Sequence, residues 1–148
     1  MIPNALTIAG VDPSGGAGVL ADIKAFSALG AYGTGVICAL TAQNTQAVTG
    51  VQGISPEFIR LQLDTLFADV RIDSAKTGML GTAAIARAVA DGLAGRRGAD
   101  ADLRHLVVDP VMVAKSGDSL LDRSAIDTLI EAVLPLATVI TPNLPEAG

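Results

Sequence analysis

The feature that most constrains the fold is a regular alternation of short apolar segments with longer amphipathic ones. Four segments have apolar residues on one helical face: 19–29, a segment that opens at Ser55, 82–93 and 124–134. They separate five apolar segments with strand character: 5–9, 35–42, 74–79, 103–108 and 138–141. This alternation predicts an α/β fold with a mainly parallel sheet and helices on both faces.

Local signals sharpen some of these boundaries. Ser55 is a typical N-cap, and Pro56 and Glu57 suit the first turn of the helix that follows. Thr82 is expected to cap the next helix. Two polar segments, 43–53 and 95–102, are expected to be a loop and a solvated connection.

Composition indicates how the core is built and which partners are excluded. Half of the 148 residues are hydrophobic and tryptophan is absent, so Ala, Val, Leu and Ile must fill the core of a single domain, residues 1–148. A net charge of −5, with no basic run longer than Arg96-Arg97, argues against nucleic acid as a partner. We expect no membrane association and a cytoplasmic location, because the sequence shows neither a signal peptide nor a long apolar run. The single cysteine, Cys38, lies in an apolar run and is expected in the core.

A glycine-rich loop, 10–18, follows the first apolar segment. Glycines let a ligand approach the backbone closely, so the loop is a candidate binding site. A dinucleotide fingerprint is excluded, since no acidic residue occurs from Lys24 to Pro56. A Walker loop is excluded because Lys76 and Lys115 each follow alanine. The loop could also be only a connection between strand and helix.

Polar residues follow each of the five apolar segments, at 10–18, 43–45, 76–81, 109–118 and 141–146. In open parallel sheets, ligands bind at the carboxyl ends of the strands. These five clusters are therefore expected to meet in one site.

Five motifs together resemble a known family: ALTIAGVDPSGGAG (5–18), ALTAQN (39–44), KTGML (76–80), DPVMVAKSGD (109–118) and TPNLPEA (141–147). They resemble the hydroxymethylpyrimidine/phosphomethylpyrimidine kinases of thiamine biosynthesis, in the ribokinase-like superfamily. The resemblance implies a three-layer sandwich and two successive ATP-dependent phosphorylations, of the pyrimidine alcohol and of its monophosphate. Because family members are longer and the chain ends in the first turn of a helix, we expect it to be the N-terminal part of one kinase domain.

The resemblance also implies roles for individual residues. Gly10, Asp22, Gln43, Met79 and Val111 would line the pyrimidine pocket. An amide such as that of Gln43 offers both a donor and an acceptor to an aminopyrimidine, and Met79 and Val111 can pack on its ring. Asp22 could instead be a first-turn acid, and Gln43 an amide that caps a loop.

Other residues would serve ATP and Mg²⁺. Asp109 and Glu146 are the expected metal ligands, with Asn143 and Glu146 in the phosphate region, because Mg²⁺ prefers a few carboxylates plus water and phosphate oxygens. Lys115 would meet phosphate. Alternatives stay open for three of them: Asp109 as a turn residue before Pro110, Glu146 as a first-turn acid and Lys115 as a solvated charge.

The catalytic residue is expected beyond Gly148, in the family's second glycine-rich motif, so residues 1–148 alone are expected to be inactive. The resemblance also implies a homodimer. A pyridoxal or pyridoxine kinase and a non-catalytic pyrimidine-binding module are the alternative functions. His105 is expected to be structural.

Overall fold

The computed structural model describes residues 1–97, 103–112 and 121–147. Its six-stranded sheet has the order β3-β2-β1-β4-β5-β6. The strands are β1 (Asn4–Val11), β2 (Tyr32–Gln43), β3 (Val48–Gly53), β4 (Ser74–Thr77), β5 (His105–Val108) and β6 (Val139–Ile140). Every neighbouring pair is parallel except β2 and β3, which confirms the predicted mainly parallel sheet.

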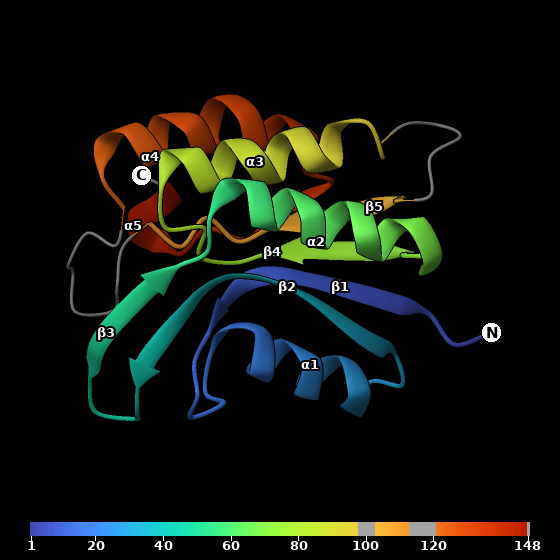
Figure 1. Cartoon of the computed structure of the whole chain (residues 1–148), viewed down its shortest axis with the longest axis horizontal. Coiled ribbons are helices and arrows are strands. Elements are labelled where there is room, and N and C mark those ends of the chain that lie inside the picture. Colours follow the sequence, from blue (N-terminus) through green and yellow to red (C-terminus); the bar gives the residue numbers. More distant parts are fainter. Residues whose placement is uncertain (98–102, 113–120, 148) are drawn as a thin grey trace.

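Helices cover both faces of the sheet, as expected. They are α1 (Gly18–Ala28), α2 (Pro56–Asp69), α3 (Ala83–Ala94), α4 (Arg123–Thr128) and α5 (Leu144–Ala147). In Figure 1, α1 lies on one face, and α2, α3 and α4 lie together on the other. The result is the three-layer arrangement that the sequence predicts. The structure describes no helix with the length and apolar character needed to cross a membrane.

The segment expected as one helix over 124–134 changes its geometry along its length. After α4, a π-helical turn (Leu129–Val133) and a 3-10 turn (Leu134–Leu136) complete it. Pro135 lies in the 3-10 turn, has no N–H to donate and crowds the carbonyl four residues before it. An uninterrupted α-helix is therefore disfavoured there.

The loop expected over 43–53 is wrong in its second half, because β3 pairs antiparallel with β2. Asn44 builds the turn between them: its side-chain oxygen accepts from the N–H groups of Gln46 and Ala47, at 2.8 and 3.0 Å. This self-bonding asparagine turn allows a hairpin despite the polar, glycine-bearing sequence. Figure 1 shows the hairpin extending past the end of the sheet.

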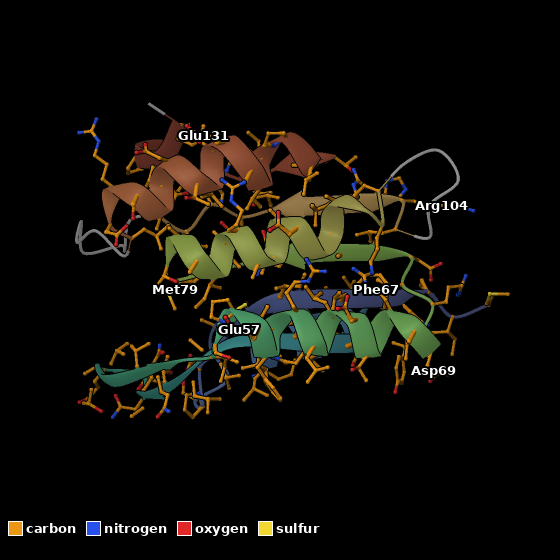
Figure 2. The ribbon with its side chains drawn as sticks, turned by 45° about the horizontal axis from the view of Figure 1, so that its top comes forward. Glu57, Phe67, Asp69, Met79, Arg104 and Glu131 are labelled. Carbon is orange, nitrogen blue, oxygen red and sulfur yellow. The ribbon has the colours of Figure 1, made fainter. Side chains whose placement is uncertain are left out.

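The order of the strands fixes where a site can form. From β1 the chain passes to β2 on one side, and it later returns to β4 on the other side of β1. Between β1 and β4 the sheet therefore has a topological switch point, where open α/β sheets form their binding crevice. The crevice lies at the carboxyl ends of the strands. In Figure 2, Met79, just after β4, marks this end of the sheet, and Arg104, just before β5, marks the opposite end.

The core lies between the sheet and the three helices of one face. Side chains from the strands and from α2 and α3 are fully buried there, including Leu6, Ile8, Val36, Ile59, Leu63, Val89 and Leu93. Cys38 is buried among them, which confirms its expected place in the core, and burial raises the pKa of its thiol to about 12. A thiol so rarely ionised is a poor nucleophile.

The connection after α3 begins with two arginines that are not solvated in the expected way. Arg96 pairs with Asp64 at 2.8 Å and lies 4.6 Å from the centre of the Phe67 ring. Arg97 donates to the carbonyls of residues 103, 104 and 136 and to the hydroxyl of Thr138. The five donors of a guanidinium group allow it to hold several chain segments at once. Residues 98–102 lie outside the described part.

Candidate active site

The glycine-rich loop folds back on itself after β1. Val11 and Gly18 form an isolated antiparallel bridge that closes the loop. Gly15 and Gly18 have φ values of +73° and +61°, in the left-handed region that favours glycine. A Cβ at Gly18 would also overlap the carbonyl oxygen of Gly10. Glycine at position 18 is therefore required for this loop geometry.

Asp12 organises the inside of the same loop. Its carboxylate accepts from the N–H and the hydroxyl of Ser14, at 2.8 and 2.7 Å. The hydrogen bond from the Ser14 side chain is the largest influence that lowers the pKa of Asp12. Asp12 is thus an ionised, nearly buried group beside the binding crevice.

A cavity of about 460 Å³ opens at the switch point of the sheet. It takes residues from the ends of β1, β2 and β4, from the hairpin strand β3 and from the segment after β5. Four of the five predicted pocket residues line it: Gly10, Gln43, Met79 and Val111. A Cβ built on Gly10 would lie 3.5 Å from the methyl group of Met79, so these two residues are neighbours in the cavity wall.

The hairpin supplies one wall of this cavity. Val48 and Val51 line it and are 54% and 63% exposed. Beside them, the Gln43 side-chain oxygen accepts from the Thr41 hydroxyl at 3.0 Å. The wall therefore offers apolar surface for a flat ring and an amide for its polar edge.

The fifth predicted residue, Asp22, is not among the residues that line the cavity. Its carboxylate instead accepts from the Thr7 hydroxyl at 2.6 Å and from the Lys76 ammonium at 3.0 and 3.2 Å. Lys76 takes the place at the cavity wall. The sequence analysis includes Lys76 in the polar cluster 76–81 and in the KTGML motif but assigns it no role in the site. The signal that could reveal Lys76 is the strand register. Thr7 and Lys76 are partners on neighbouring strands, and both bond Asp22 of α1.

A second cavity of about 350 Å³ adjoins the first. Its lining residues are Asp109, Val111, Thr141, Pro142, Asn143 and Glu146. Asp109 and Val111 line both cavities. The structure therefore brings the expected metal and phosphate residues next to the expected pyrimidine residues. Lys115 lies outside the described residues.

Asn143 and Glu146 form a reciprocal cap at the start of α5. The Asn143 side-chain oxygen accepts from the Glu146 N–H at 3.0 Å, and the Glu146 carboxylate accepts from the Asn143 N–H at 3.0 Å. The other Glu146 oxygen accepts from the Met112 N–H at 2.7 Å. Glu146 thus has the first-turn role left open by the sequence and also holds the segment after β5.

The surroundings of Asp109 shift the pKa of its carboxyl group. Burial is the main cause that raises its pKa, while nearby Lys76 acts in the opposite direction. The next turn is strained, because Val111 has a φ of +45°, an unusual value for a β-branched residue. Asp109 and Glu146 are the two carboxylates among the described residues that line the second cavity, and two carboxylates suit Mg²⁺. No group of three or more metal-ligating side chains occurs in the described ranges.

His105 is the first residue of β5, at the amino end of the sheet, and it is exposed. This position separates it from both cavities, and its structural role stays a prediction.

Comparison with known proteins identifies the family to which this chain belongs. The model of the phosphomethylpyrimidine kinase family matches residues 12–148, nearly the whole chain. The chain belongs to the phosphomethylpyrimidine kinase family. The expected resemblance is thereby confirmed, and so is the ribokinase-like fold, because the solved relatives superpose over almost the whole chain.

Three relatives, two phosphomethylpyrimidine kinases and one pyridoxal kinase, illustrate the similarity. The hydroxymethylpyrimidine/phosphomethylpyrimidine kinase of Salmonella typhimurium is 58% identical over 98% of this chain and 53% of its own length. A crystal structure of phosphomethylpyrimidine kinase from Clostridium difficile matches with a TM-score of 0.91 and 44% identity, over 98% of this chain and 61% of the other. The Staphylococcus aureus pyridoxal kinase, solved with AMP-PCP and pyridoxal, matches with a TM-score of 0.83 and 34% identity, over all of this chain and 51% of the other. The chain spans about half the length of the curated relatives it matches.

Proposed function

We propose that this chain contributes the substrate cavity of a kinase that transfers phosphate from ATP to 4-amino-5-hydroxymethyl-2-methylpyrimidine and then to its monophosphate, in thiamine diphosphate biosynthesis. The observation that carries this proposal is the convergence of Gly10, Gln43, Met79 and Val111 on one cavity. These residues come from four separate segments of the sequence. A cavity with an apolar wall and one amide suits a flat aminopyrimidine.

ATP and Mg²⁺ are the proposed co-substrate and metal. Asp109 and Glu146 would hold the metal, although each Glu146 oxygen already accepts one backbone hydrogen bond. Glu146 therefore fits a role through a bridging water molecule. When bound, Mg²⁺ would neutralise charge on the transferring phosphate. Asn143, and Lys115 in the part not described, would serve the phosphates.

The complete gene product tests the proposal in one assay. ATP-dependent phosphorylation is measured with hydroxymethylpyrimidine, its monophosphate and pyridoxal as acceptors. We expect turnover of both pyrimidines at a kcat/KM well above that of pyridoxal. Preference for pyridoxal would instead support a pyridoxal kinase, a function favoured by the pyridoxal kinases among the structural relatives. Binding of the pyrimidine without turnover would indicate a binding module.

The role of Gln43 can be tested separately. Replacing it with leucine removes an amide pairing worth about 1–3 kcal/mol, so pyrimidine binding is expected to weaken about tenfold or more. Gln52, exposed on β3 and outside the cavity lining, gives the control Gln52→Leu. Equal pyrimidine affinities of both variants in calorimetry would remove Gln43 from the site.

We propose a cytoplasmic location and a homodimer for the complete protein, both on the basis of the family resemblance. Sedimentation of the complete gene product tests the dimer, and a sedimenting monomer would reject it.

A further inference from the structure

The cavity at the switch point has an uneven distribution of charge. Two carboxylates, Asp12 and Asp109, are among the residues that line it. Lys76 is the only cationic side chain among the described lining residues. An anion that enters this cavity meets two like charges and one opposite charge, so the position of the Lys76 ammonium becomes important.

That ammonium is held in place from two other elements. Asp22 on α1 bonds it through both carboxylate oxygens, at 3.0 and 3.2 Å. The Thr7 hydroxyl on β1, which is fully buried, fixes the same carboxylate at 2.6 Å. The side chains of Lys76 and Asp22 are 24% and 19% exposed, so solvent competes only weakly with this pair. Lys76 thus has a fixed direction, unlike a free surface lysine.

The pair with Asp22 does not use all of the ammonium group. Lysine has three N–H donors, and the two Asp22 oxygens take at most two of them. Beside the ammonium lies Gly78, where a Cβ would be 3.2 Å from the nitrogen. Glycine therefore leaves space next to Lys76, and Gly78 itself lines the cavity. At least one donor is available to an acceptor of a bound ligand.

We propose that Lys76 is a specificity-determining residue that binds the phosphate group of the phosphorylated pyrimidine. This inference rests on the proposed function and assigns the second substrate to a particular side chain. The pyrimidine alcohol is neutral and can occupy the apolar wall without a cation. A phosphate monoester carries close to two negative charges at neutral pH and would be repelled by Asp12 and Asp109. The ammonium, whose charge Asp22 partly compensates, offsets part of that repulsion through a directed hydrogen bond to the phosphate.

The test compares the two substrates on Lys76→Met in the complete gene product. Charge-assisted hydrogen bonds predict about a 10- to 100-fold loss of affinity for the pyrimidine monophosphate, measured by calorimetry without ATP. Affinity for the alcohol is expected to change less than about threefold. That change is smaller than the roughly tenfold loss expected when one hydrogen bond is removed. Steady-state kcat/KM is expected to show the same split between the substrates.

Two further variants guard against a folding effect. Lys76→Met leaves the Asp22 carboxylate without its cation, where it would repel the phosphate. The double variant D22N/K76M removes both charges and is expected to lose monophosphate binding as well, by less than Lys76→Met. Lys76→Arg keeps the positive charge and is expected to retain part of the affinity for the monophosphate. Lys24→Met removes a lysine that bonds the carbonyl of Gly15 and does not line the cavity, and it is the control.

Equal losses for both substrates, or no loss for the monophosphate, would overturn the role of Lys76. Failure of the proposed function is distinguishable, because the wild-type protein would then turn over neither pyrimidine. The calorimetric comparison still decides the Lys76 proposal in that case, since absence of monophosphate binding by wild type would reject it.

Discussion

The side-chain amide of Gln62 makes with Ile37 the two backbone hydrogen bonds that a neighbouring strand would make. Its oxygen accepts from the Ile37 N–H at 2.9 Å, and its nitrogen donates to the Ile37 carbonyl at 3.0 Å. Pairing with β3 begins only at Ala39, so Ile37 lies on a stretch of β2 that this strand does not reach. Helix α2 thus closes an open strand edge.

Removing this amide is expected to destabilise the fold. Gln62→Leu leaves a part-buried N–H and carbonyl without partners, at a cost of about 1–3 kcal/mol. Chemical denaturation of the complete gene product measures the change. Gln46→Leu, at the exposed hairpin turn, is the control, and equal stabilities of the two variants would contradict the prediction.

Thr77 and Thr7 form a matched pair of buried threonines. Both are fully buried on neighbouring strands, but the Thr77 hydroxyl has no hydrogen-bond partner among the described residues, and the Thr7 hydroxyl bonds Asp22. Thr77→Val replaces an unpaired polar group with a methyl group, so the Tm is expected to stay equal or rise. Thr7→Val is expected to lower it. A similar loss in both variants would show that the Thr77 hydroxyl does have a partner.

Gly18 and Gly30 separate two reasons for glycine. Both have positive φ, but a Cβ at Gly30 has no atom of the described residues within 4 Å, whereas a Cβ at Gly18 overlaps the carbonyl of Gly10. Gly30→Ala should cost about 1–2 kcal/mol of left-handed strain alone. Gly18→Ala is expected to lower the Tm further and to weaken pyrimidine binding, because the loop must open. Normal pyrimidine affinity of Gly18→Ala would refute this expectation.

Asp109 is expected to favour activity at the expense of stability. Burial raises its pKa, so at pH values between the unfolded and folded pKa the folded state holds more protons, and the free energy of unfolding falls as pH rises. Asp109→Asn is therefore expected to be more stable than wild type at pH 7, with an advantage that shrinks as pH falls from the folded pKa of Asp109 towards its unfolded pKa and is lost below the unfolded pKa. Its kcat is expected to fall if Asp109 holds Mg²⁺ as proposed, because the variant lacks that negative charge.

Urea unfolding at pH 7 and at a pH below the unfolded pKa measures the effect on stability. Turnover at limiting Mg²⁺ measures the effect on activity. A variant that is less stable at pH 7, or one that is fully active, would remove the corresponding role from Asp109.

Much of the fold follows from local signals. Ser55 and Thr82 cap their helices as predicted, by accepting from the N–H groups of Phe58 and Ile85. Such caps can be predicted because both partners lie within three residues. The strand β3 was not predicted, because its pairing depends on a turn built by Asn44 and not on an apolar pattern of its own.

The candidate site shows the same division between local and distant effects. Gly10, Gln43, Met79 and Val111 were named from motifs, and each lies at a strand end where the topology brings them together. Lys76 escaped notice because its position depends on a carboxylate 54 residues away in the sequence. Register across two strands and a helix, rather than any short motif, gives this lysine its place.

The hairpin wall also affects the thermodynamics of ligand binding. Val48 and Val51 hold their side chains over the cavity while more than half exposed to water. A flat ring that settles against them removes water from apolar surface on both partners, and this desolvation lowers the heat capacity of the complex. Binding of such a ligand is therefore expected to become more exothermic as temperature rises, and these two valines of β3 contribute to the slope.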